Sequence, residues 1–104
     1  MPSGPLFRDV VFSNGIARVT FDYAEGLTTS DGKALRTFEL AGTDGLFHPA
    51  EAKVIEGTAS VEVRSDKVPE PVAVRYGWQP FTEANLVNSA GLPASTFRSE
   101  DLGR

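Results

Sequence analysis

A single histidine is the only imidazole on which this chain could build nucleophilic catalysis. A serine hydrolase needs a hydroxyl nucleophile, an imidazole that takes its proton and a carboxylate that orients the imidazole. His48 stands in Leu-Phe-His-Pro, where the neighbouring proline indicates a turn, and no serine lies in a Gly-x-Ser-x-Gly motif. We therefore expect His48 to be a surface or turn residue and the chain to contain no catalytic residue.

The 14 acidic residues could supply a carboxylate pair or a metal site. A glycosidase needs two carboxylates across a cleft, and calcium needs several oxygens that converge on one point. The aspartates mostly stand at expected strand ends or turns, where Asp is common because its side chain accepts bonds from backbone N–H groups: Asp9, Asp22, Asp31, Asp44, Asp66 and Asp101. Because no Asp-x-Asp-x-Asp loop is present, we expect neither a metal ion nor another cofactor.

The aromatic residues around the only tryptophan suit either a core or a sugar-binding platform. Tyr76 and Trp78 share one face of an alternating strand with Val72 and Val74, which favours burial. Tryptophan on a central strand is a common packing anchor of β-sandwiches. The alternative is an exposed platform that stacks on a sugar ring, with an amide group beside it to bond the sugar hydroxyls. The candidate glycan-binding residues are Tyr76, Trp78, Phe81 and Asn85.

The composition indicates one folded domain that binds neither nucleic acid nor a membrane. A chain of 104 residues fits a single domain with one core. The net charge is −4 and the basic residues are scattered, so the positive patch of a nucleic-acid-binding protein is missing. Apolar runs are too short for a membrane span, and the first five residues have none of the features of a signal peptide. Without cysteine the chain has no disulfide or cysteine-zinc site, an absence that is compatible with any compartment.

Several segments alternate polar and apolar residues with the period of a half-buried strand. In residues 58–64, for example, Ala59, Val61 and Val63 point to one side and the polar residues point to the other. Further strands are expected at residues 7–12, 16–23, 36–41, 50–55 and 72–79.

The segments between these strands have turn chemistry. Ser13-Asn14-Gly15 can supply the residues with positive φ that a tight hairpin needs. Similar turns are expected at Asp31-Gly32, Asp44-Gly45 and Glu56-Gly57. About seven short strands at this spacing predict an all-β fold, an antiparallel immunoglobulin-like or fibronectin-like β-sandwich, with a small barrel as the alternative. We interpret residues 1–104 as one domain, with a linker remnant at 1–5 and an irregular C-terminal segment at 80–104.

Four stretches carry a resemblance to a known family. They are SGPLF at 3–7, FELAGTDGLFHPAEAKV at 38–54, VAVRYGWQP at 72–80 and NLVNSAGLPASTFRSEDL at 85–102. Together, and in this order, they resemble the C-terminal region of sialate O-acetylesterases, which are carbohydrate esterases of the SGNH type. The resemblance covers nearly the whole chain. One departure is Val87, which stands where the family usually carries tyrosine.

The resemblance implies a chain without the family's catalytic machinery. In that family the nucleophilic serine lies in a Gly-Asp-Ser block and the base lies in an Asp-x-x-His block. Neither block is present here, because the residue three positions before His48 is Gly45. The chain is therefore expected to be a non-catalytic C-terminal accessory domain that supports the catalytic domain of a sialate O-acetylesterase-like enzyme. The compartment stays open, and a periplasmic or secreted parent is compatible with the resemblance.

Two kinds of partner remain open for such a domain. A catalytic domain of the same protein would pack on apolar residues of the C-terminal segment, and the candidate docking residues are Leu86, Leu92, Pro93 and Phe97. The same side chains could instead cover the open end of this chain's own sandwich. The alternative function is a stand-alone carbohydrate-binding module that uses the aromatic platform.

Overall fold

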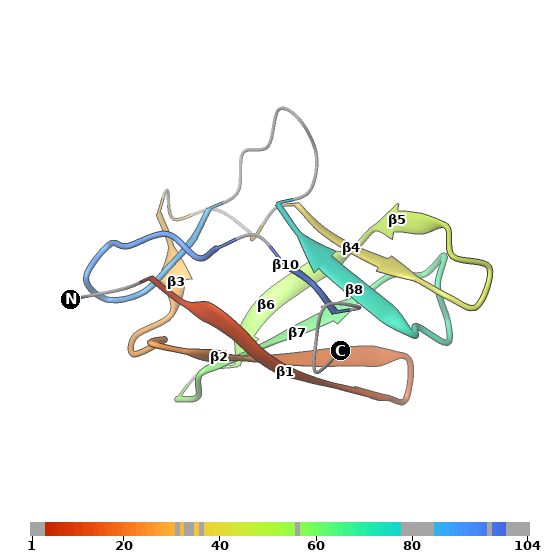
Figure 1. Cartoon of the computed structure of the whole chain (residues 1–104), viewed down its shortest axis with the longest axis horizontal. Helices are drawn as coiled ribbons and strands as arrows, with labels where there is room; N and C mark the ends of the chain where they lie inside the picture. Colours follow the sequence, from red (N-terminus) through yellow and green to blue (C-terminus); the bar gives the residue numbers. More distant parts are fainter. Residues whose placement is uncertain are drawn as a thin grey trace.

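Short antiparallel strands build the fold, and the region that the structure describes contains no α-helix (Figure 1). The computed structural model describes residues 4–30, 32, 35, 37–55, 57–77, 85–95 and 97–99. The strands are β1 (Leu6–Ser13), β2 (Ile16–Asp22), β3 (Thr28–Thr29), β4 (Phe38–Ala41), β5 (Phe47–Pro49), β6 (Glu51–Ile55), β7 (Ser60–Arg64), β8 (Ala73–Tyr76), β9 (Leu86–Val87) and β10 (Phe97–Arg98).

The first sheet has the strand order β1-β2-β7-β6 and arises from two hairpins. Asn14 and Gly15 join β1 to β2 with φ angles of 53° and 77°, the left-handed conformation that a two-residue hairpin turn requires. Gly57, with φ 80°, lies in the turn between β6 and β7. Both hairpins confirm the turns that the sequence predicts, although Glu56 lies outside the described residues.

The second sheet has the order β10-β8-β4-β5, and β3 pairs with β9 in a small third sheet. The turn at Asp44 and Gly45 joins β4 to β5 as expected. Strands β9 and β10 belong to the segment that we expected to be irregular. Within the described part of this segment, strands are limited to these two pairs of residues: Leu86 and Val87 pair with β3, and Phe97 and Arg98 extend the second sheet beside β8.

The core lies between the two larger sheets and is formed by alternate residues of their central strands. It includes Ala17, Val19 and Phe21 of β2, Val61 and Val63 of β7, Phe38 and Leu40 of β4, Val74 and Tyr76 of β8, and Phe97 of β10. Burying each large apolar side chain contributes about 1.5–3 kcal/mol. An all-β fold of two packed antiparallel sheets confirms the predicted sandwich class. Val72 is an exception to the predicted buried face, because it precedes β8 and is exposed.

Phe97 connects the two sheets through its aromatic ring. The ring stacks on Phe7 of β1 with a centroid distance of 4.5 Å and meets the ring of Phe21 edge-on at 5.8 Å. It also lies 6.0 Å from the ring of Tyr76. Such ring pairs add about 0.5–1.5 kcal/mol beyond the burial of their area. A residue near the end of the chain thus completes the centre of the core.

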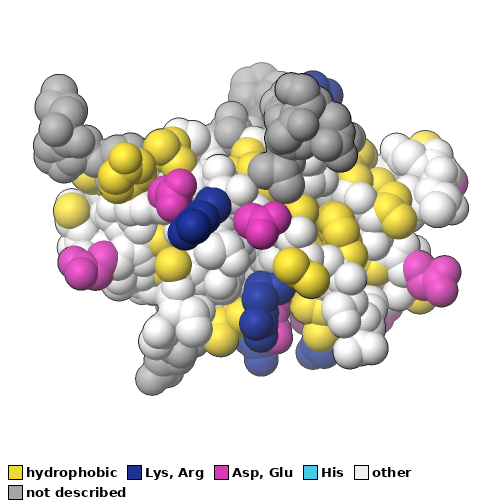
Figure 2. All heavy atoms as spheres, turned by 60° about the horizontal axis from the view of Figure 1, so that its bottom comes forward, with side chains coloured by type: hydrophobic (Ala, Val, Ile, Leu, Met, Phe, Trp, Pro, Cys, Tyr) yellow, Lys and Arg dark blue, Asp and Glu magenta, His cyan; other side chains and the backbone are white. Residues whose placement is uncertain are grey.

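The outer face of the first sheet is charged. Figure 2 shows basic and acidic side chains interspersed on the side of the molecule that carries this sheet. Glu62 of β7 stands opposite Arg18 of β2 on one side and Lys53 of β6 on the other. Opposite charges directly across strands are favourable and keep a sheet face in water. This face is therefore an ordinary solvated surface.

The two ends of the sandwich are built from different parts of the chain (Figure 1). At the end that we call proximal, the chain enters at Gly4, and the turn at residues 22–27, the β6–β7 hairpin, β3, β9 and residues 88–95 gather there. At the distal end lie the β1–β2 turn, residues 42–46 and residues 65–70.

Candidate functional site

His48 lies in a setting that offers no catalytic triad among the described residues. It is half-buried in the middle of β5, not in the turn that we expected, and stands opposite Leu40. It lines a hollow of about 240 Å³ at the distal end together with Asp44, Lys67 and Glu70. Within the described lining of this hollow, only Thr43 has a hydroxyl group. No group of three or more potential metal ligands occurs in the described part of the chain.

Two of the four candidate glycan-binding residues are buried. The Oη atom of Tyr76 accepts a hydrogen bond from the backbone N–H of Leu86 at 3.0 Å. Asn85 is buried too, and its backbone carbonyl accepts a bond from the N–H of Ser30 at 2.8 Å. These placements correct the prediction for Tyr76 and Asn85, because neither side chain can reach a sugar in water. Trp78 and Phe81 lie outside the described residues.

The candidate docking residues divide into two pairs. Leu86 and Phe97 are buried within this chain, so their side chains are not available to a second domain. This corrects the docking prediction for these two, since both are needed to fill their own core. Leu92 is half-buried and Pro93 is exposed, and both lie at the proximal end.

Asn88 organises the proximal end. Its Nδ2 atom donates to the carbonyl of Tyr23 at 3.0 Å. Its Oδ1 atom accepts the backbone N–H groups of Ala90 at 3.0 Å and Leu92 at 3.1 Å. A buried amide is stable only when its donors and acceptors are paired, so these bonds fix the C-terminal segment against the turn that follows β2.

Two further contacts hold the same segments together. The N–H of Ser89 donates to the carbonyl of Glu25 at 2.8 Å, and the N–H of Ser95 donates to the carbonyl of Pro5 at 3.1 Å. Gly4 lies so close to the carbonyl oxygen of Pro93 that a Cβ atom at this position would collide with it. The first described residues and the C-terminal segment are therefore held together. We call the contacts of Gly4 with Pro93 and of Pro5 with Ser95 the entry clamp.

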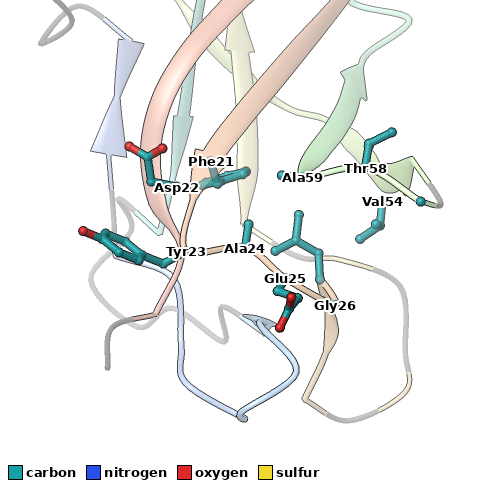
Figure 3. Close-up of a pocket in the computed structure, with 11 residues that line it drawn as sticks. Phe21, Asp22, Tyr23, Ala24, Glu25, Gly26, Val54, Thr58 and Ala59 are labelled. Atoms are coloured by element: carbon teal, nitrogen blue, oxygen red, sulfur yellow. The ribbon is translucent and has the colours of Figure 1, made fainter. Parts of the chain in front are cut away.

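A hollow of about 750 Å³ opens at the proximal end between the turn after β2 and the β6–β7 hairpin (Figure 3). Its floor is apolar and comprises Phe21, Ala24, Leu27, Val54 and Ala59. Asp22, Glu25 and Thr58 also line it. The hollow is open and offers apolar surface beside carboxylates, and none of its described lining residues is a histidine.

Among the described residues at this end, Tyr23 is the most exposed large hydrophobic one. Its side chain extends to the side away from Val54 and Thr58 (Figure 3) and is 63% exposed. Its φ angle is 56°, in the left-handed region that non-glycine residues seldom adopt. Tyr23 is not among the site residues that the sequence predicts. No local signal identifies it, because the bond that holds its carbonyl comes from Asn88, 65 residues later.

An ion pair lies on the outer face of the second sheet. The Nε atom of Arg75 lies 2.7 Å from Oε1 of Glu39, whose side chain is only 6% exposed. The guanidinium of Arg75 also lies over the ring of Phe47, 4.0 Å from its centroid. A carboxylate that is this deeply buried and already paired serves the fold rather than a ligand.

No helix in the described part of the chain is long and apolar enough to cross a membrane.

Comparisons with known proteins relate the chain to carbohydrate esterases. No protein-family model matches the chain, and no curated protein matches it. Among solved structures, a carbohydrate acetylesterase from Xanthomonas citri matches with a TM-score of 0.86 and 44% sequence identity. The match covers 92% of this chain and 22% of that enzyme, so this chain spans a small part of the enzyme's length.

Proposed function

We propose that this chain is a non-catalytic accessory domain of a larger carbohydrate acetylesterase and that it supports the catalytic domain of that protein. The extent of the match to the Xanthomonas citri enzyme carries the proposal. At 44% identity the match includes nearly all of this chain, yet it leaves 78% of the enzyme outside. The catalytic groups of such an esterase then belong to the larger part.

The finer assignment is to the C-terminal β-domain of a sialate O-acetylesterase-like enzyme of the SGNH type. The ordered motifs between residues 3 and 102 support it. The parent enzyme would remove acetyl groups from sugar hydroxyls by attack of a serine, with a histidine as base. The partner of this domain is then the catalytic domain of the same protein.

The strand order supports an immunoglobulin-like type of sandwich. In constant-type immunoglobulin domains, strands A, B, E and D face strands C, F and G. Here β1-β2-β7-β6 has the order A-B-E-D, and β10-β8-β4 has the order G-F-C. Strand β5 is an addition at the edge beside β4.

Two experiments test the proposal. The coding DNA upstream of the Met1 codon is expected to contain, in frame, a Gly-Asp-Ser block and, shortly before this chain, an Asp-x-x-His block. The purified chain alone is expected to leave an aryl acetate and an O-acetylated sugar intact. Hydrolysis by the pure chain that is lost in a His48→Ala variant would overturn the proposal.

A further inference from the structure

We propose that the proximal end of the sandwich is the surface on which the catalytic domain packs. An apolar side chain of that domain, flanked by a basic group, would occupy the hollow between the turn after β2 and the β6–β7 hairpin. Tyr23 would pack against the surface beside it. This inference rests on the proposed function and adds to it the location and the chemistry of the contact.

The contacts of Gly4 and Pro5 fix the point at which the chain enters the sandwich, and this point lies at the proximal end. Pro5 is buried, its carbonyl is bonded to Ser95, and Gly4 fits under the carbonyl of Pro93. The chain therefore leaves the sandwich in a fixed direction and does not behave as a flexible linker there. A domain joined before Gly4 starts beside the hollow, so contact at this end needs no long connection.

The hollow and its rim define the chemistry of the partner surface. Its floor, which includes Leu27 and Val54, favours an apolar side chain. The exposed carboxylates of Asp22 and Glu25 favour a lysine or arginine beside that side chain. Asp22 already has Arg8 at 3.7 Å, but both side chains are more than half exposed, and such surface pairs are weak.

Tyr23 is held in an exposed position at a cost in backbone energy. A left-handed conformation costs a non-glycine residue about 1 kcal/mol. Asn88 donates a hydrogen bond to the carbonyl of this residue, which holds the strained backbone of the turn in place. Tyrosine is enriched in protein interfaces because it offers a large, rigid and partly polar contact area. A strained backbone conformation at an exposed aromatic residue therefore supports a contact between Tyr23 and the partner domain.

The other exposed apolar residues provide a matched comparison. Leu46 is 62% exposed, nearly the same as Tyr23, but it lies at the distal end in a turn closed by local bonds. In the described part of the chain, the hydrogen bond of the entry residue Pro5 runs to Ser95 at the proximal end and not to this turn. If the catalytic domain packs on the proximal end, a change at Tyr23 affects the contact and the same change at Leu46 does not.

The experiment uses a chimera in which this chain replaces the matching segment of the Xanthomonas citri acetylesterase. Hydrogen exchange of the backbone amides is compared between the chimera and the free chain. We expect amides in residues 22–27 and 57–59 to exchange at least about tenfold more slowly in the chimera, and amides in residues 43–46 to be unchanged.

Two variants sharpen the measurement. Asparagine tolerates the left-handed conformation, so Tyr23→Asn removes the ring with little added strain. We expect Tyr23→Asn to lower the Tm of the chimera by about 4 °C more than it lowers the Tm of the free chain. The control variant, Leu46→Asn, is expected to change both by the same amount.

The outcomes separate the two proposals. If the chimera hydrolyses acetyl esters and melts as one unit but the slowed amides lie at the distal end, the docking surface is wrong and the proposed function stands. Equal effects of Tyr23→Asn on the chimera and the free chain would also overturn the docking surface. This segment could instead have the same Tm and the same amide exchange rates in the chimera as in the free chain. That result would overturn both the proposed supporting role and the proposed docking surface.

Discussion

The two ends of the sandwich are stabilised in different ways. At the distal end each turn closes on itself. The N–H of Gly45 donates to the carbonyl of Gly42 at 3.0 Å, and the N–H of Leu46 donates to Oδ1 of Asp44 at 3.0 Å. These bonds join residues that are neighbours in sequence, so the distal turns can form together with their hairpins.

At the proximal end the bonds join segments that are far apart in sequence. Asn88 reaches back to Tyr23, and Ser95 reaches back to Pro5. Such contacts form only after the loop between them has closed, which carries an entropic cost. The proximal end therefore depends on hydrogen bonds between remote segments, whereas the bonds within the distal turns are local, although residues 67–70 also pack against residues 42–48 there. Substitutions at the two ends should therefore differ in their effect.

The largest effect is expected from Phe97→Ala. The ring of Phe97 fills the core between the sheets and stacks on Phe7, so its loss should lower the free energy of unfolding by about 3–5 kcal/mol. Urea denaturation measures this quantity. The control is Leu46→Ala, an exposed distal site, which should change the free energy of unfolding by less than about 0.5 kcal/mol. Similar losses in the two variants would contradict the comparison.

A smaller loss is expected from Asn88→Ala. The variant leaves the carbonyl of Tyr23 and the N–H groups of Ala90 and Leu92 without their partner, which should cost about 2–3 kcal/mol. The matched control is Asn14→Gly in the distal hairpin, where glycine keeps the positive φ angle and little stability should be lost. Equal urea midpoints for the two variants would show that the side-chain bonds of Asn88 add nothing to the stability.

Gly4→Ala tests the entry clamp. The new Cβ atom would meet the carbonyl oxygen of Pro93, so residues 93–95 must move, and we expect a loss of about 1–3 kcal/mol. Gly42→Ala is the distal control, because the nearest atom to its Cβ would be the carbonyl oxygen of Glu70 at an ordinary 3.6 Å. Thermal unfolding compares the two variants. An unchanged Tm for Gly4→Ala would mean that residues 93–95 can move away from the new Cβ atom without loss of stability.

The smallest effect is expected from Asp44→Ala. It removes one exposed hydrogen bond to the N–H of Leu46, worth about 0.5 kcal/mol. The loss should remain local, so the amide of Leu46 should exchange faster while that of Ser89, at the proximal end, keeps its rate. Faster exchange of Ser89 in this variant would indicate that the two ends are coupled.

The same contrast explains what the sequence could predict. Alternation within residues 16–23 and 58–64 predicts β2 and β7, because the period of a strand is a local property. Asn14-Gly15 predicts its hairpin for the same reason. Together these local signals suffice for the class of the fold and for most of its core.

The proximal end could not be predicted because its partners are remote in sequence. Strands β9 and β10 have two residues each, too few to show any period. Leu86 and Phe97 are recognisable as apolar anchors. Their spacing does not indicate whether they fill the core of this sandwich or pack on a second domain. The hollow is formed by two turns more than 25 residues apart. The sequence of one turn does not indicate that it packs beside the other.

The bond between Ser95 and Pro5 also determines how this domain would bear a mechanical load. A pull on the chain before Gly4 reaches β1 through the backbone of Pro5, and it also loads the contacts of Gly4 and Pro5. It acts on the bond to Ser95 and on the packing of Gly4 under Pro93, and so also passes to the C-terminal segment. The force is shared between the two sheets, because β1 belongs to one and Phe97, close after Ser95, belongs to the other. The first described residues are thus held by strands from both layers of the sandwich.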